Sequence, residues 1–245
     1  MAGHSKFKNI QFRKGKQDKV RSKLFSKLSR DITIAAKTGL PDPAANARLR
    51  LAIANAKAES MPKDNIDRAI KKAAGGEADN MEEIRYEGFG PGGVGVIVEV
   101  LTDNRNRTNG EIKKIFERGN ADVGKPGSSA YLFDRKGFFA IDAAKHPDED
   151  ALMTVALEAG AEDLTREGDV FEVTCDTSSF STVLEALKAA NVEPVEAEVK
   201  YLAKVQKDID VETGKKLVKL IEALDDYDDV QNVSTDAALT EEMGE

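Results

Sequence analysis

The chain has 245 residues, of which 40% are hydrophobic and 33% charged, and its net charge is −8. This length predicts one to three domains with a buried core. No apolar run approaches the roughly 18 residues of a transmembrane helix, and no apolar h-region of a secretory signal follows the cationic first 30 residues. One cysteine and two histidines argue against disulfides and metal centres, so we expect a soluble cytoplasmic protein with no metal, cofactor or small-molecule substrate.

Half of the Lys and Arg residues lie in the first 75 positions. Residues 1–75 contain 18 Lys and Arg against 6 Asp and Glu, whereas residues 76–245 contain 18 against 38. The resulting net charges of +12 and −20 indicate a basic module for polyanions joined to an acidic body. The alternative is a basic helix that docks on the protein's own acidic body.

The candidate nucleic-acid contacts are concentrated in the first 30 residues, where cations alternate with Phe7, Phe12 and Phe25. Clustered cations gain affinity for nucleic acid by releasing counterions from its phosphates, and an exposed Phe7 can stack on unpaired bases. The predicted contacts in this region are Lys6, Phe7, Lys8, Arg13, Lys14, Lys16, Lys19, Arg21, Lys23, Lys27 and Arg30.

Residues 16–37 are predicted to form an amphipathic helix. At about 100° per residue, apolar side chains occupy one side and most of the lysines the opposite side. Gly39 is expected to end this helix in the left-handed conformation. A second helix is predicted to open at Asp42-Pro43, with Asp42 as N-cap, and a third at Met61-Pro62. Their apolar stripes predict a three-helix domain over residues 1–76.

From about residue 81 the pattern changes to strands. We predict strands at 84–86, 94–101, 121–123 and 130–133, with a helix at 108–118. Residues 137–203 then follow the order strand, helix, two strands, helix, strand, which is the ferredoxin-like motif.

The segment before this motif lacks one helix and one strand of the same pattern, and the C-terminal residues supply both, at 212–224 and 230–233. The sequence therefore predicts an α+β protein of three domains: a helical domain at 1–76, a discontinuous ferredoxin-like domain at 77–134 plus 204–245, and a second ferredoxin-like domain at 135–203 inserted into it.

Several motifs are similar to known sites but lack their context. The glycines of 88–93 match a dinucleotide fingerprint, yet a strand follows them where a helix is needed, so a turn is favoured. Residues 124–128 lack the spacing of a P-loop, and 136–139 match an aromatic RNA-recognition motif poorly, which favours core packing. Cys175 is expected to be a buried, inert thiol. No arrangement of catalytic residues emerges, so no enzymatic activity is predicted.

Two further charged segments have open interpretations. Arg105 and Arg107 precede the helix at 108–118 and can bind phosphate at its N-terminus, or else Asn106 or Thr108 caps the helix and the arginines form local ion pairs. Four aspartates at 225–229 can hold a cation through their oxygens, although a solvated helix end is the commoner explanation.

Motifs along the whole chain resemble those of the YebC-like family, usually described as transcriptional regulators, with a mitochondrial relative that activates translation of cytochrome c oxidase. The matching segments are MAGHSK (1–6), RKGKQD (13–18), MPKDNIDRAIKK (61–72), YEGFGPGG (86–93), LTDNRNRT (101–108), AYLF (130–133), ALEAGAED (156–163) and DDVQNV (228–233). Phe7 stands where the family usually has tryptophan, so the indole N–H donor is absent.

The resemblance implies a three-domain α+β fold and non-enzymatic regulation linked to nucleic acid. We therefore expect a regulator that binds DNA through the basic N-terminal region. A first alternative is a ribosome-associated translation factor that binds ribosomal or transfer RNA, which the acidic overall charge and the lack of a clear helix-turn-helix favour slightly. A second alternative is a protein-interaction module.

Overall fold

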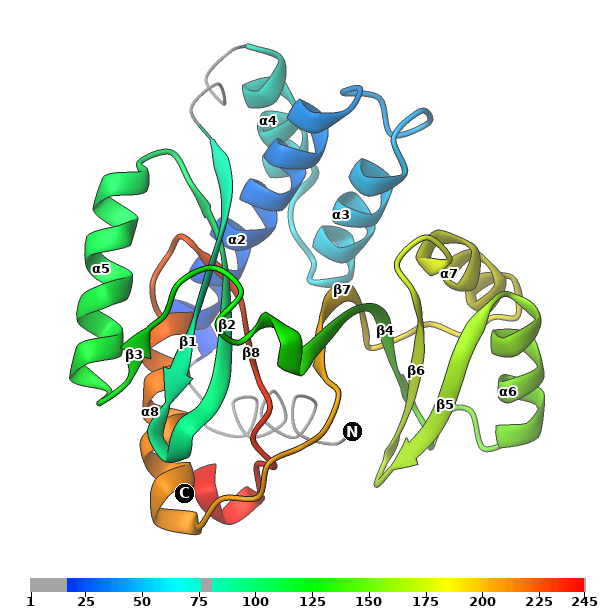
Figure 1. Cartoon of the computed structure of the whole chain (residues 1–245). Helices are drawn as coiled ribbons and strands as arrows, with labels where there is room; N and C mark the ends of the chain where they lie inside the picture. Colours follow the sequence, from blue (N-terminus) through cyan, green and yellow to red (C-terminus); the bar gives the residue numbers. More distant parts are fainter. Residues whose placement is uncertain (1–16, 76–80, 245) are drawn as a thin grey trace.

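The fold joins a helical unit to two four-stranded antiparallel sheets, each with helices packed on one face (Figure 1). It is seen in a computed structural model that describes residues 17–75 and 81–244. The predicted α+β class is therefore confirmed. None of the helices in these two ranges is long and apolar enough to cross a bilayer.

The helical unit is organised around α2, on which the other two helices both pack. Its elements are α2 (Gln17–Thr38), α3 (Ala47–Ala58) and α4 (Lys63–Ala74). Ile32, Leu49 and Ala56 are fully buried in its core. The apolar stripes read from the sequence thus face one another.

Asn46 determines where α3 begins, so the prediction of a start at Asp42-Pro43 was wrong. The Asn46 side chain accepts a hydrogen bond from the amide of Leu49 at 3.0 Å and donates to the carbonyl of Ala35 at 2.8 Å. Asp42 instead accepts from the amide of Ala44 in the preceding turn.

Gly39 does not adopt the predicted left-handed conformation. A Cβ at Gly39 would lie 2.5 Å from the Asn46 side chain, so close approach explains this glycine.

The first sheet, here sheet A, has the strand order β3-β1-β2-β8, and α5 and α8 cover one of its faces. Val96, Val98, Phe116 and Leu217 are buried between sheet and helices. The bounds are β1 (Glu82–Gly90), η1 (Pro91–Gly93), β2 (Val94–Thr102), α5 (Arg105–Arg118), β3 (Asp122–Val123), α8 (Val211–Asp225), β8 (Val230–Thr235) and η3 (Glu241–Gly244).

The C-terminal strand β8 pairs with β2, so the end of the chain completes sheet A. The predicted strand at 130–133 is wrong, because 130–132 form the short helix η2 (Ala130–Leu132). The position next to β2 on its other side is filled by β1. The glycine motif at 88–93 forms the turn between β1 and β2, as predicted, with positive φ at Gly92 and Gly93.

The second sheet, sheet B, has the order β5-β6-β4-β7 with all neighbours antiparallel, which is the ferredoxin-like arrangement. Phe139 is fully buried and stacks on Phe180 at 4.7 Å between ring centroids, and Phe138 is 2% exposed, so both are core residues as predicted. The bounds are β4 (Phe133–Asp142), α6 (Glu149–Glu158), β5 (Ala161–Glu167), β6 (Val170–Asp176), α7 (Phe180–Ala189) and β7 (Glu196–Ala203).

Candidate nucleic-acid interface

The predicted contacts of the N-terminal region divide into three groups. Those before α2 lie outside the described residues: Lys6, Phe7, Lys8, Arg13, Lys14 and Lys16. Lys19 and Arg21 lie in the first turns of α2, where only the backbone is described. Lys23, Lys27 and Arg30 follow at spacings of four and three residues, which places them on one face of the helix.

The face of α2 that carries these three cations contacts four aspartates at the end of α8 and in its connection to β8. We call these residues the acidic segment: Asp225, Asp226, Asp228 and Asp229. The Lys23 ammonium lies 2.8 Å from the Asp226 carboxylate, and the Lys27 ammonium lies 3.0 Å from that of Asp225. The chain's own carboxylates thus occupy the basic face of α2.

Arg30 completes this contact. Its guanidinium lies 3.1 Å from the carboxylate of Asp229 and also donates a hydrogen bond to the carbonyl of Asp228. These pairs are what the docking alternative expects for Lys23, Lys27 and Arg30, while their role toward nucleic acid stays a prediction.

The contact of α2 with the acidic segment has an electrostatic basis at the end of α8. A helix carries partial negative charge at its C-terminal end, and Asp225 and Asp226 add to it there. The cations of α2 compensate this charge. Because the side chains of Lys23 and Asp226 are 38% and 77% exposed, solvent screens their pair, and pairs of this kind contribute about 0.2–1 kcal/mol. A chain of phosphates can therefore compete with the acidic segment for α2.

Asp229 is the most tightly held member of the acidic segment and is 2% exposed. One carboxylate oxygen accepts hydrogen bonds from Thr108 at 2.6 Å, Arg107 at 2.9 Å and Thr102 at 3.1 Å. Burial alone would raise the pKa of Asp229, but these hydrogen bonds and the charge of Arg30 hold it below its ordinary value. Asp229 is therefore ionised at neutral pH, and its hydrogen bonds with Arg107 and Thr108 hold the start of α5 against β8.

Arg105 and Arg107 form ion pairs with carboxylates of the chain. Arg107 lies 3.0 Å from Asp103 and 2.9 Å from Asp229, and Arg105 lies 3.6 Å from Glu82. The ion pairs expected if these arginines do not bind phosphate are therefore present.

The cap of α5, however, is neither of the predicted residues. The side chain of Asn104 accepts from the amide of Arg107 at 3.0 Å, whereas the Thr108 hydroxyl is buried against Asp229. Asn106 and Thr108 were thus the wrong caps, because α5 begins at Arg105 and both residues lie inside it.

The loop that is similar to a P-loop binds an internal anion. The amides of Gly127, Ser129 and Ala130 donate to the carboxylate of Glu87 at 2.9–3.1 Å. Burial alone would raise the pKa of Glu87, but these three donors and the charge of Arg85 outweigh it and hold the pKa below its ordinary value. The amides that would cradle a phosphate are already used, which also explains why 130–132 do not form a strand.

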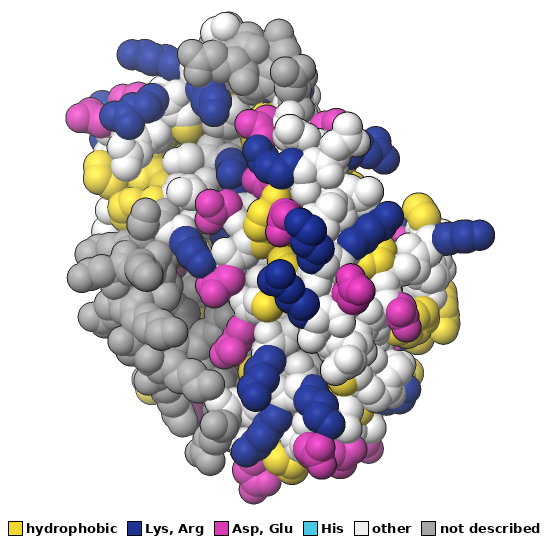
Figure 2. All heavy atoms as spheres, turned by 90° about the vertical axis from the view of Figure 1, so that its left-hand side faces the viewer, with side chains coloured by type: hydrophobic (Ala, Val, Ile, Leu, Met, Phe, Trp, Pro, Cys, Tyr) yellow, Lys and Arg dark blue, Asp and Glu magenta, His cyan; other side chains and the backbone are white. Residues whose placement is uncertain are grey.

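A second basic surface lies on the helices of sheet A. Of the 18 cations in residues 76–245, eight lie on α5 and α8, which carry only five of the 38 acidic residues. Figure 2, seen from the side of α5, shows Lys and Arg side chains across this face among fewer Asp and Glu. Lys113, Arg118 and Lys219 are exposed there. On α5 and α8 the cations thus outnumber the acidic residues by eight to five.

Asp31 lies where the three structural units meet. Its partly buried carboxyl is surrounded by Arg48 of α3, Glu83 of β1 and Glu198 of β7. Burial raises the pKa of Asp31 to about 7, and the two glutamates add to the effect against the charge of Arg48. Asp31 was not among the predicted residues, and Asp229 was predicted only as one of four aspartates that can hold a cation, since only the tertiary structure surrounds them with these charged partners.

A helical unit followed by two four-stranded antiparallel sheets, with sheet B lying between β3 and β8 of sheet A along the chain, defines the class of this protein. Residues 5–76 match the model of the TACO1/YebC protein N-terminal domain, and residues 81–237 match that of the TACO1/YebC second and third domain. The chain belongs to the TACO1/YebC family. This confirms the resemblance inferred from the sequence motifs.

A solved structure shares the fold over almost its whole length. The crystal structure of a conserved hypothetical protein, Aq1575 from Aquifex aeolicus, is 41% identical and covers 90% of this chain and 91% of its own, with a TM-score of 0.83.

Proposed function

We propose that this protein is a non-enzymatic, cytoplasmic regulator of gene expression that binds nucleic acid through its basic N-terminal region. The supporting observation is the separation of charge, with +12 in residues 1–75 and −20 in the remainder. Membership of a commonly regulatory family agrees with this role. Phosphate contacts of this kind provide affinity without reading base sequence.

Promoter DNA is the first candidate target, in keeping with the name transcriptional regulator. The second candidate is ribosomal or transfer RNA, which would make the protein a translation factor. The contact between α2 and the acidic segment supports the second, because α2 must leave the acidic segment before it can enter the major groove. A compact RNA needs only phosphate contacts along the basic region.

Fluorescence anisotropy with labelled duplex DNA, an RNA hairpin and single-stranded RNA tests the proposal. If about six cations meet phosphates of duplex DNA, log K should fall against log salt with a slope near −5. A slope near zero for every probe would contradict nucleic-acid binding and favour a protein-interaction module instead.

Phe7 distinguishes the two kinds of target. Phe7→Ala should weaken binding to single-stranded RNA more than binding to duplex DNA, because stacking needs an unpaired base. Phe7→Trp is the matched control, since it keeps an aromatic ring and should retain binding. Co-sedimentation with ribosomes, compared with retention on genomic DNA from the same lysate, then assigns the target in the cell.

A further inference from the structure

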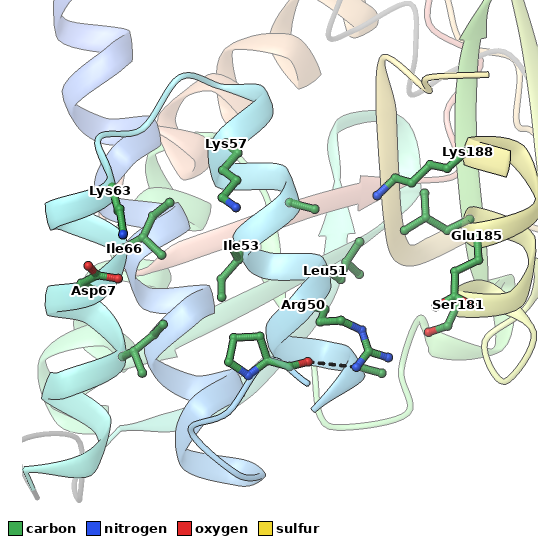
Figure 3. A pocket seen from close by; sticks show the side chains of 15 residues that line it. Arg50, Leu51, Ile53, Lys57, Lys63, Ile66, Asp67, Ser181, Glu185 and Lys188 are labelled. Atoms are coloured by element: carbon green, nitrogen blue, oxygen red, sulfur yellow. Dashed lines mark hydrogen bonds between the residues drawn. The ribbon is translucent and has the colours of Figure 1, made fainter. Parts of the chain in front are cut away.

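A groove of about 490 Å³ lies between α3, α4 and α7, where the helical unit meets the helices of sheet B (Figure 3). Each helix lines it with residues three and four positions apart, as Lys63, Ile66, Asp67 and Ile70 do on α4. Residues at this spacing share one face of a helix. Three helices therefore present one face each to a common space that no described residue fills.

The floor of the groove is aliphatic and belongs to two different cores. Ile53 and Ile70 pack on the core of the helical unit, whereas Leu51 packs on the core of sheet B. All three are only partly buried, and the lining residues include no aromatic side chain. Nucleobases bind protein chiefly by stacking on aromatic rings, whereas branched aliphatic side chains interdigitate with the apolar face of a helix. The floor thus suits a helix better than a base.

The rim of the groove is basic. Arg50, Lys57, Lys63 and Lys188 surround it against two carboxylates, Asp67 and Glu185. Figure 3 shows Lys57 and Lys63 directed into the space between α3 and α4, and Lys188 extending from α7 toward α3.

The three lysines of this rim differ from the cations of α2. Lys57, Lys63 and Lys188 are exposed, and none of them takes part in the ion pairs formed within residues 17–75 and 81–244. Lys23 and Lys27, in contrast, are neutralised by the acidic segment. The rim therefore offers positive charge that an external partner can use.

We propose that this groove binds an acidic amphipathic helix of a partner protein. Apolar side chains of the partner at positions i, i+3, i+4 and i+7 fill the space above Ile53 and Ile70, and its flanking carboxylates meet Lys57, Lys63 and Lys188. The added helix completes a four-helix arrangement with α3, α4 and α7. This binding is separate from the contact with nucleic acid and does not depend on it.

Selection from a library of random 16-residue peptides on the immobilised full-length protein tests the proposal. The enriched peptides should be negatively charged and carry Leu, Ile or Met at helical spacing. In anisotropy titrations with labelled copies, the Lys57→Glu/Lys63→Glu/Lys188→Glu variant should bind them at least tenfold more weakly. These lysines are exposed, so the variant should keep the thermal stability of the wild type.

A variant with the same change of charge elsewhere provides the control. Lys113→Glu/Lys215→Glu/Lys219→Glu alters exposed lysines of α5 and α8 and should leave peptide affinity within about twofold. Ile53→Asp should abolish binding, because it places a carboxylate on the apolar floor.

Two results would overturn the proposal. One is a selection that yields no acidic amphipathic sequence, or peptides whose affinity the rim variant does not change. The other is a rim variant that loses binding of an RNA hairpin but not of peptides, which would assign the groove to nucleic acid. Loss of RNA binding through substitutions on α2 alone bears only on the proposed function.

Discussion

Neutralising Asp225 and Asp226 should strengthen nucleic-acid binding, whereas reversing the charge of their partners Lys23 and Lys27 should weaken it. Both double variants break the same two ion pairs, at 2.8 and 3.0 Å. Asp225→Asn/Asp226→Asn leaves the cations of α2 available for phosphates, but Lys23→Glu/Lys27→Glu removes them. Both changes remove the same two ion pairs, but they have opposite effects on the charge that α2 presents to a polyanion.

The expected size follows from the exposure of the pairs. Each partly exposed ion pair contributes about 0.5 kcal/mol, so a polyanion that displaces the acidic segment must break both pairs at a cost of about 1 kcal/mol. Removing this cost should lower Kd about fivefold. Lys23→Glu/Lys27→Glu eliminates two phosphate contacts and adds repulsion, so we expect a loss of about tenfold or more, with a salt slope less steep by about two.

Anisotropy with the RNA hairpin and the DNA duplex at two salt concentrations measures these changes, and thermal melting checks that both variants remain folded. Equal shifts of affinity in the same direction would refute the reasoning. They would show that the contact between α2 and the acidic segment serves only to hold the domains together.

Further predictions concern the buried and partly buried carboxylates. Asp229→Asn should reduce the free energy of unfolding by urea by about 2 kcal/mol at pH 7. Because the pKa of Asp229 is lowered on folding, this difference should disappear as the pH falls from about 4 through the folded-state pKa. For Asp31 the pH dependence has the opposite sign, because its folded-state pKa of about 7 lies above the unfolded value. The wild type should therefore lose stability as the pH rises from about 4 to 7, and Asp31→Asn should abolish that loss in the same assay. Glu87→Gln should speed amide hydrogen exchange at 127–130 by about tenfold or more, and unchanged exchange would contradict the role of that carboxylate.

The sequence was sufficient to predict the elements whose signal is local. Period and order predicted the ferredoxin-like arrangement of sheet B and the completion of sheet A by β8. The start of α3 was missed because Asp42 and Asn46 are both good N-caps. Contacts of Asn46 with the carbonyls of Ala35 and Leu40 decide between them, and such contacts exist only in the folded unit.

The candidate interface was predictable in composition but not in its contacts. Counting charges reveals a basic first third and an acidic remainder. The pairing of Lys23 with Asp226 joins residues 203 positions apart, and it depends on where sheet A places the end of α8. Likewise, nothing in the order of residues shows that Glu87 reaches the amides of 127–130, because that contact depends on β1 lying beside β3.

The interruption of sheet A has a consequence for synthesis of the chain. Residues 133–203 can fold as soon as they leave the ribosome, whereas β2 waits for β8, which emerges only after them. Until then the backbone of β2 is unpaired on the side of β8, and its side chains from Val94 to Val98 are almost all apolar. Such a strand edge is open to pairing with other chains. A polypeptide truncated before residue 230 should therefore aggregate even though its inserted domain is complete.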